Sequence, residues 1–229
     1  MVNGFEYLHN RNVDDNLINE FGIAYFKDNQ LYGPSTSPIY EKLCNFLSQK
    51  SKEGLDLKTY DDCILIPILD LYNNIVSFAA RYLNPKGKSK FIGVKGFKKS
   101  LLLFGLNSAY KEILKKDEVI LVEGYWEVLA LHKVGIYNVV ALCGCSIKDI
   151  QVSYLMRFTK NFKILLDPDA AGDEGSKRVS KIIESFGGNT EILRLKATVD
   201  IDEFLAKYNI EEFIRSCGLS QKYIQESLK

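Results

Sequence analysis

The chain has 229 residues, of which 46% are hydrophobic and 26% are charged, with a formal net charge of +1 at pH 7. This composition is typical of a folded globular protein and excludes a disordered chain. The apolar runs are far shorter than the roughly 20 residues that cross a bilayer, and the first residues lack a signal-peptide pattern, so we expect a cytoplasmic protein without a membrane partner. The five cysteines are scattered and form no CxxC pair, so we expect reduced thiols and no zinc in this chain.

The first part of the chain, residues 1–115, is predicted to be a mixed α and β region. Apolar residues recur at helical spacing over 5–25 and 37–51. Residues 61–83 have the pattern of two strands joined by an Asn-Asn turn.

A basic segment closes this region. Residues 71–111 contain no Asp or Glu, and their basic residues include Arg81, Lys90, Lys98 and Lys99. Such a segment can bind a polyanion through counterion release, although a solvated basic face would have the same composition. The stretch GVKGFKKS at 93–100 resembles a phosphate-binding P-loop, but Lys98 occupies the position of the second glycine, which excludes a P-loop NTPase.

Strand and helix patterns alternate over residues 116–200. The aliphatic runs EVILVEG, NVVALCG, FKILLDPD and TEILRLK predict strands buried on both faces of an open, mostly parallel sheet flanked by helices. Residues 201–229 are expected to form a short helical tail. The predicted fold class is therefore α/β, with a mixed α+β subdomain at 1–115, the parallel sheet at 116–200 and a partial helical subdomain at 201–229.

Acidic residues follow three of the predicted strands: Glu123, then Asp167 and Asp169, then Asp200 and Asp202. In a parallel sheet the ligand crevice lies beyond the carboxyl ends of the strands, so these side chains are expected to converge. Two like charges 4 Å apart cost roughly 4 kcal/mol at an effective dielectric constant near 20, so the cluster needs a cation to stay ionised. An all-oxygen ligand set favours Mg²⁺ or Mn²⁺ over zinc.

Each acid alone also has an ordinary structural explanation. Asp169 and Asp202 could cap the helices that follow them, and Glu123 could be a solvated loop residue. The coincidence of acids at successive strand ends is what favours a metal site.

These motifs resemble a known family. The stretches LVEGYWEVLALHKVGIYNVVALCGCSI, ILLDPDAAGDEGSKRV and DIDEFL resemble the TOPRIM domain of bacterial primases, topoisomerases and some nucleases. Upstream, YLHNRNVDDNLINEFGIAY, IPILDLYNNIVSFAARYL, KSKFIG and GFKKSLLLFGLNSA are similar to the RNA polymerase core of bacterial DnaG-type DNA primases. The chain departs from the family pattern at Glu127, where Asp is common, and at Phe91 and Gly93, which replace a Tyr and an Asn.

The resemblance implies a primase catalytic core that makes short RNA primers on single-stranded DNA from NTPs by metal-dependent nucleotidyl transfer. It implies that Asp167 and Asp169 are catalytic metal ligands and that Asp200 and Asp202 complete the site. Glu123 would be a ligand or general base.

The resemblance also assigns roles outside the metal site. The residues that would hold the template or the incoming nucleotide are Arg81, Lys90, Lys98 and Lys99. The matched stretches include neither the zinc-binding module nor the helicase-binding domain of the family. We therefore expect an excised core or a minimal primase, with a separate zinc-binding module and a replicative helicase as partners.

Three other functions are weighed against primer synthesis. A TOPRIM nuclease would use the same acids, but relatives of that type usually bring an ATPase domain, and the sequence has no P-loop. A noncatalytic single-strand-binding replication protein would not need the intact acids. A topoisomerase would need a nucleophilic tyrosine on a second large domain.

Overall fold

The computed structural model describes residues 3–85, 87, 89–98, 102–144 and 146–227, which divide into two compact units, Met1–Phe97 and Lys98–Lys229. The division falls before the predicted boundary after residue 115, because helix α4 (Leu106–Lys116) packs against strand β7 (Val139–Ala141) of the second unit. The finer division into three functional parts stays a prediction. No helix in the described part of the chain is both long enough and apolar enough to cross a membrane.

The first unit is a five-stranded antiparallel sheet with the strand order β2-β1-β3-β4-β5. Its strands are β1 (Ala24–Lys27), β2 (Gln30–Tyr32), β3 (Cys63–Leu69), β4 (Ile75–Tyr82) and β5 (Phe91–Gly93). Its helices are α1 (Gly4–Asn10), α2 (Asp15–Phe21), α3 (Pro38–Lys52) and the 3-10 helix η1 (Leu57–Tyr60).

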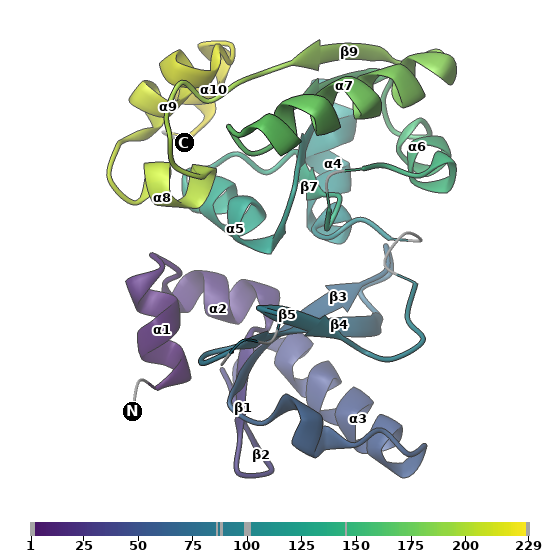
Figure 1. The fold of residues 1–229 in the computed structure, drawn as a ribbon, viewed down its shortest axis with the longest axis vertical. Helices are drawn as coiled ribbons and strands as arrows, with labels where there is room; N and C mark the ends of the chain where they lie inside the picture. The colour runs from purple at the N-terminus through teal and green to yellow at the C-terminus, as the bar shows by residue number, and fades with distance from the viewer. Residues whose placement is uncertain (1–2, 86, 88, 99–101, 145, 228–229) are drawn as a thin grey trace. The chain divides into compact units, whose positions relative to one another are not determined.

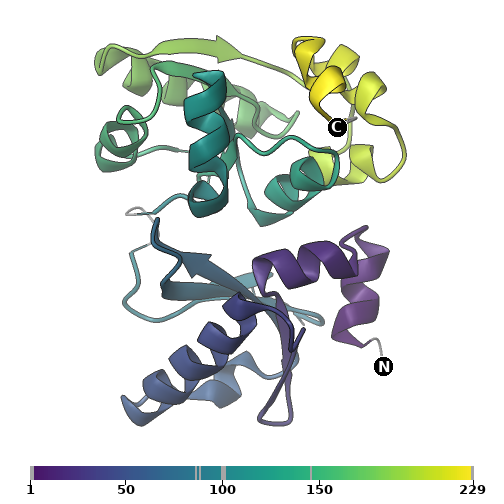
Figure 2. The ribbon, with the colours of Figure 1, turned by 180° about the vertical axis from the view of Figure 1, so that it is seen from behind.

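The two faces of this sheet are covered by different helices. Helix α3 packs on one face, where Leu43 and Leu47 join a core that includes Phe78 of β4. Helix α1 lies over the other face, because Gly4 sits directly against the ring of Tyr25 of β1, where even a methyl group would clash. Figures 1 and 2 show α1 and α3 on opposite sides of this sheet.

Residues 5–25, which we predicted as helical, contain two helices and the start of a strand. Gly22 adopts a left-handed conformation (φ 62°) that ends α2, and the chain enters β1 two residues later. The prediction also missed the hairpin between β1 and β2, whose turn residues Asp28 and Asn29 both have positive φ. The predicted Asn-Asn turn between β3 and β4 is confirmed, with Asn73 at φ 60°.

The second unit is a four-stranded parallel sheet with the order β7-β6-β8-β9. Besides β7, its strands are β6 (Val119–Val122), β8 (Asn161–Ile164) and β9 (Asn189–Ile192). Besides α4, its helices are α5 (Tyr125–Lys133), α6 (Asp149–Leu155), α7 (Ala170–Ser185), α8 (Ile201–Leu205), α9 (Ile210–Cys217) and α10 (Lys222–Ser227). The predicted α/β class, with its parallel sheet and flanking helices, is confirmed (Figure 1).

Burial falls across this sheet from strand β7 at one edge to strand β9 at the other. Every residue of β6 and β7 is buried, as their continuous aliphatic sequences predicted. Strand β9 is mostly exposed, contrary to the prediction, because it pairs only with β8 and forms an edge of the sheet. The sheet is therefore fully buried at β7 and β6 and mostly exposed at β9, its opposite edge.

A polar network anchors α10 to the amino-terminal edge of the parallel sheet. Tyr223 is fully buried, and its hydroxyl donates a hydrogen bond to Glu118 Oε1 at 2.5 Å. The same hydroxyl accepts a hydrogen bond from Asn138 Nδ2 at 2.9 Å. Glu118 precedes β6, Asn138 precedes β7, and Lys163 of β8 forms ion pairs with both Glu118 and Glu191 of β9. This network joins the C-terminal helix to all four strands.

We expect Tyr223→Phe to destabilise the second unit by about 1.5–3 kcal/mol, because the change leaves the partly buried Glu118 carboxylate without its strongest neutral donor. The measurement is urea unfolding followed by circular dichroism. Tyr208→Phe, at a tyrosine that is 48% exposed, is the matched control and should leave the midpoint unchanged. Equal midpoints for wild type and Tyr223→Phe would contradict the anchoring role.

Candidate metal centre

The carboxyl ends of the parallel strands carry a cluster of acidic side chains. Its six members are Glu123, Glu127, Asp167, Asp169, Asp200 and Asp202. Five of these residues were predicted from the sequence, and the structure brings them together in the second unit. The sixth, Glu127, was noted only as a departure from a family pattern. Its spacing was an available signal, because it stands four residues after Glu123, at the start of the following helix.

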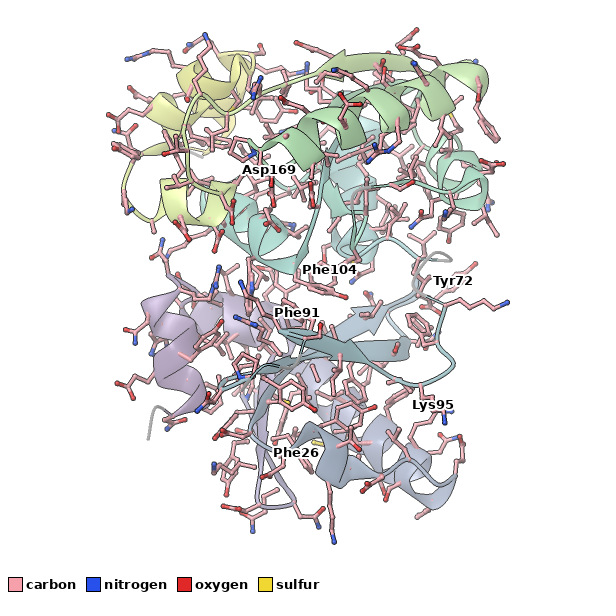
Figure 3. All side chains as sticks on the ribbon, in the orientation of Figure 1. Phe26, Tyr72, Phe91, Lys95, Phe104 and Asp169 are labelled. Carbon is pink, nitrogen blue, oxygen red and sulfur yellow. The ribbon has the colours of Figure 1, made fainter. Side chains whose placement is uncertain are left out.

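Local structure fixes the position of each acid. Glu123 directly follows β6, and its carbonyl accepts a hydrogen bond from the backbone N–H of Gly144 in the turn after β7. Asp169 caps helix α7 by accepting a hydrogen bond from the backbone N–H of Gly172 at 2.7 Å. Figure 3 shows Asp169 at the start of α7. The capping role that we considered for Asp169 is therefore real, and it orients the residue within the cluster.

The acids of α8 reach the cluster through helix packing. Helix α8 begins after Asp200 and packs against α5, which carries Glu127. Asp202 and Glu127 are each only 7% exposed. Two carboxylates are thus held in a largely water-free environment on adjacent helices.

Burial and mutual repulsion disfavour negative charge in this cluster. Burial, together with the charges of Asp167, Asp202 and Asp200, raises the pKa of Glu127 to about 8. Burial and the charges of neighbouring acids, led by Glu123, raise the pKa of Asp167 to about 7. Burial also raises the pKa of Glu123. A hydrogen bond from the Asp167 backbone lowers this pKa, but the effect of burial is larger. A positive charge placed here would favour the ionised form of all three side chains.

The residues present fit a hard divalent cation. Asp167 Oδ1 and Glu127 Oε2 are buried acceptors without a hydrogen-bond partner among the described residues. Carboxylate oxygens are the ligands that Mg²⁺ and Mn²⁺ prefer. In the described part of the chain, no three His, Cys, Asp or Glu side chains already form a group that could hold a metal ion. The cluster thus has the charge and ligand type of such a site, and its side chains would have to draw closer around an ion.

A tight backbone contact holds the Asp167 loop against α7. A Cβ atom added to Gly172 would lie 2.1 Å from the carbonyl oxygen of Asp167, so no larger residue fits without moving the loop. Because the contact is with backbone, a change of side-chain rotamer cannot relieve it.

We therefore expect Gly172→Ala to displace Asp167 and to lower both metal affinity and stability. A loss of stability would be diagnostic, since alanine in a helix interior otherwise stabilises a protein by roughly 1 kcal/mol relative to glycine. Binding of Mn²⁺, followed by isothermal titration calorimetry, should weaken by about 10-fold or more, as when groups that orient metal ligands are altered. Ala171→Ser, at the exposed neighbouring position, is the control. A Gly172→Ala protein with greater stability and normal affinity would show that the contact is dispensable.

The predicted basic residues lie in different environments. Arg81 of β4 is only 9% exposed, whereas Lys90 and Lys98 are exposed. Lys99 lies outside the described residues. Lys90 is in the first unit and Lys98 begins the second, so each is considered with its own unit.

Two family models match successive parts of the chain. Residues 2–110 match the family described as the DNA primase catalytic core, N-terminal domain, and residues 120–205 match the Toprim-like family. Together with the relatives and solved structures described below, these matches support a DnaG-type primase. The resemblance seen in the sequence is thereby confirmed.

Individual primases give the same result. The chain is 31% identical over 219 residues to a DNA primase of Clostridium acetobutylicum and 27% identical over 220 residues to one of Staphylococcus epidermidis. These alignments cover 92% and 91% of this chain but only 36% of each relative, so the chain spans about a third of their length.

Solved primase structures share the fold. The Aquifex aeolicus primase structure, which comprises zinc-binding and RNA polymerase domains, matches with a TM-score of 0.77 and 29% identity over 94% of this chain and 56% of that one. The E. coli primase catalytic core matches with a TM-score of 0.72 and 23% identity, over 98% of this chain and 76% of that one. The fold of this chain is therefore that of a DnaG catalytic core.

Proposed function

We propose that this chain is the nucleotidyl-transfer core of a DNA primase and synthesises short RNA on a single-stranded DNA template. One observation carries the proposal: six carboxylates converge at the carboxyl edge of the parallel sheet, with two buried oxygens unpaired among the described residues. Such a cluster has no structural benefit of its own, since its members repel one another and are costly to bury. It is well suited to phosphoryl transfer, in which charge builds up on oxygen atoms.

The acids would divide the work among themselves. Asp167 and Asp169 would hold the divalent cation, and Glu127, Asp200 and Asp202 would complete its surroundings. A bound Mg²⁺ or Mn²⁺ would lower the pKa of the attacking 3′-hydroxyl and neutralise charge on the triphosphate. Glu123, which is half-buried and whose pKa is raised, would then be placed to accept the hydroxyl proton or to act as a further ligand.

In the reaction, the 3′-hydroxyl oxygen attacks the α-phosphorus of the incoming NTP, and pyrophosphate leaves as the phosphodiester forms. Basic residues would hold the reactants by their phosphates. We assign this role to Arg81, Lys90 and Lys98, and to Lys99, which lies outside the described residues.

The decisive experiment incubates single-stranded DNA with labelled NTPs and either Mg²⁺ or Mn²⁺. Short labelled RNA that requires both template and metal would support the proposal. Cleavage of the DNA without synthesis would assign the chain to the nuclease branch of the TOPRIM proteins. Binding of the strand with neither reaction would make it a noncatalytic single-strand-binding protein.

A zinc-binding module and a replicative helicase are the partners that we propose for this core. The Aquifex aeolicus structure joins a zinc-binding domain to an RNA polymerase domain, and this chain matches 56% of it. A purified primase zinc-binding domain added in trans should stimulate initiation more than elongation of an annealed primer. A helicase partner should be retained on an affinity column that carries this chain.

The exposed lysines provide a test of template binding that does not depend on catalysis. We expect Lys90→Gln and Lys98→Gln each to lower the magnitude of the salt slope for single-strand binding by about 0.7, the value for one phosphate contact. Fluorescence anisotropy of a labelled oligonucleotide at several salt concentrations measures the slope. Lys52→Gln, at an exposed lysine of α3, removes the same charge and should leave the slope unchanged. Equal slopes for all four proteins would mean that these lysines face only solvent.

A further inference from the structure

Arg81 lies in a row of side chains that crosses the antiparallel sheet. The strand register aligns Tyr25 of β1 with Ile64 of β3, Ile64 with Arg81 of β4, and Arg81 with Phe91 of β5. Side chains on a strand alternate between faces, and Ala80, next to Arg81, belongs to the core under α3. Arg81 and its row therefore occupy the face opposite α3.

Helix α1 is fixed over this row. A capping box formed by Asn3 and Glu6 defines its first turn. Gly4 permits the close approach to Tyr25 at one end of the row. Tyr7 lies three residues later, on the same side of the helix as Gly4, and this places its ring over Arg81.

The guanidinium of Arg81 is held by two aromatic residues. Its Nε donates a hydrogen bond to the Tyr7 hydroxyl at 3.1 Å. Its central carbon lies 5.9 Å from the centre of the Tyr7 ring and 5.3 Å from that of the Phe91 ring, within the range of cation-π attraction. Tyr7 thus contacts Arg81 through both its hydroxyl group and its ring.

This arrangement leaves the arginine incompletely satisfied. Its Nη1 is buried and has no hydrogen-bond partner among the described residues, and no described carboxylate forms an ion pair with it. A buried cation without a counter-charge is costly, so an arginine held in this way is suited to an anion that arrives from outside. The planar guanidinium matches the oxygen geometry of a phosphate group, whereas a lysine ammonium in its place would not.

We infer that Tyr7 is a positioning residue that fixes Arg81, against Phe91, as a phosphate contact. This inference rests on the proposed function and deepens it, because it assigns a role to a residue of α1 that lies 74 positions before the arginine. The phosphate belongs either to the template backbone or to the incoming nucleotide. The two sources share the same chemistry, and separate binding measurements distinguish them.

The test is a double-mutant cycle on binding. Tyr7→Phe removes only the hydroxyl, and Arg81→Lys keeps the charge but loses the planar fork. Anisotropy of a labelled single-stranded oligonucleotide reports the template arm, and titration with a fluorescent NTP reports the nucleotide arm. Tyr40→Phe is the matched control, since its hydroxyl donates a comparable hydrogen bond to the Leu31 carbonyl at 2.9 Å in the same unit. Thermal unfolding of every variant shows that the proteins compared are folded.

We expect Tyr7→Phe to weaken binding about three- to tenfold in one arm, the loss typical of one hydrogen bond, and Tyr40→Phe to have no effect. In the Arg81→Lys background, Tyr7→Phe should cause no further loss, because its effect acts through the arginine. The same loss in both backgrounds would make Tyr7 merely structural and overturn the inference, as would unchanged binding in both arms. Both arms measure binding and not synthesis. A protein that binds phosphate through Arg81 and Tyr7 but makes no RNA would therefore refute the proposed function and support this inference.

Discussion

Replacing Asp167 with asparagine is expected to lower RNA synthesis by at least about 100-fold, the loss typical when a catalytic electrostatic contact is removed. Asparagine has nearly the same shape, so the loss would reflect charge rather than packing. The substitution also relieves repulsion from Glu123 and the other acids, so the variant should be at least as stable as the wild type. Asp169→Asn should behave alike, since asparagine caps a helix as well as aspartate does and preserves the start of α7.

Two measurements check this expectation. Labelled-NTP incorporation on a primed template gives the loss of activity, and thermal unfolding shows that the fold is retained. Asp149→Asn, at an exposed acid in the first turn of α6, is the matched control and should retain full activity. Near-normal synthesis by either cluster variant would end the assignment of the acids to catalysis.

The metal-free protein is expected to lose stability as the pH rises from about 5.5 to 8.5. The pKa of Glu127 is about 8 in the folded protein, compared with 4.5 ordinarily. Between these values the folded state keeps a proton that the unfolded state has released, so the free energy of unfolding falls as the pH rises. The stability gained from protonation is fully present below pH 4.5 and is lost as the pH passes through 8. Each pH unit within this window costs up to about 1.4 kcal/mol, for a total of a few kcal/mol.

Urea unfolding in the presence of a chelator, repeated across this pH range, measures the effect. Glutamine at position 127 cannot titrate, so Glu127→Gln should reduce the dependence of the unfolding free energy on pH. The dependence that is left in this variant would come mainly from Asp167. Adding Mg²⁺ or Mn²⁺ should stabilise the protein more at pH 8 than at pH 5.5, because protons compete with the cation for the same oxygens. A wild-type curve as flat as that of Glu127→Gln would show that Glu127 titrates normally.

Features encoded within a short stretch of sequence could be predicted. The continuous aliphatic runs of β6 and β7 are buried on both faces, and acids placed directly after strands converge because parallel strands end at one edge. Asp169 shows how two explanations of one residue can both apply, since its carboxylate caps a helix and also belongs to the cluster.

Two kinds of feature could not be predicted: a break inside a continuous apolar pattern, and a contact between distant residues. Helical spacing continued across Gly22 into β1, and only the left-handed turn at that glycine separates the two elements. The contact between Tyr7 and Arg81 joins residues 74 positions apart, and no local pattern encodes it. The two-residue hairpin turn at Asp28 and Asn29 differs, because its sequence carried a recognisable signal that the helical periodicity concealed.

The anchoring of α10 has a practical consequence for attaching this protein to a surface. Tyr223 is fixed beside Glu118 and Asn138, which precede strands β6 and β7, whereas the acidic cluster follows the opposite ends of the parallel strands. A tether joined to the chain beyond α10 would therefore pull on the edge of the sheet remote from the carboxylates. In a single-molecule pulling experiment, force applied in this way would enter the parallel sheet through Glu118 and Asn138, at the ends of β6 and β7 opposite the acidic cluster.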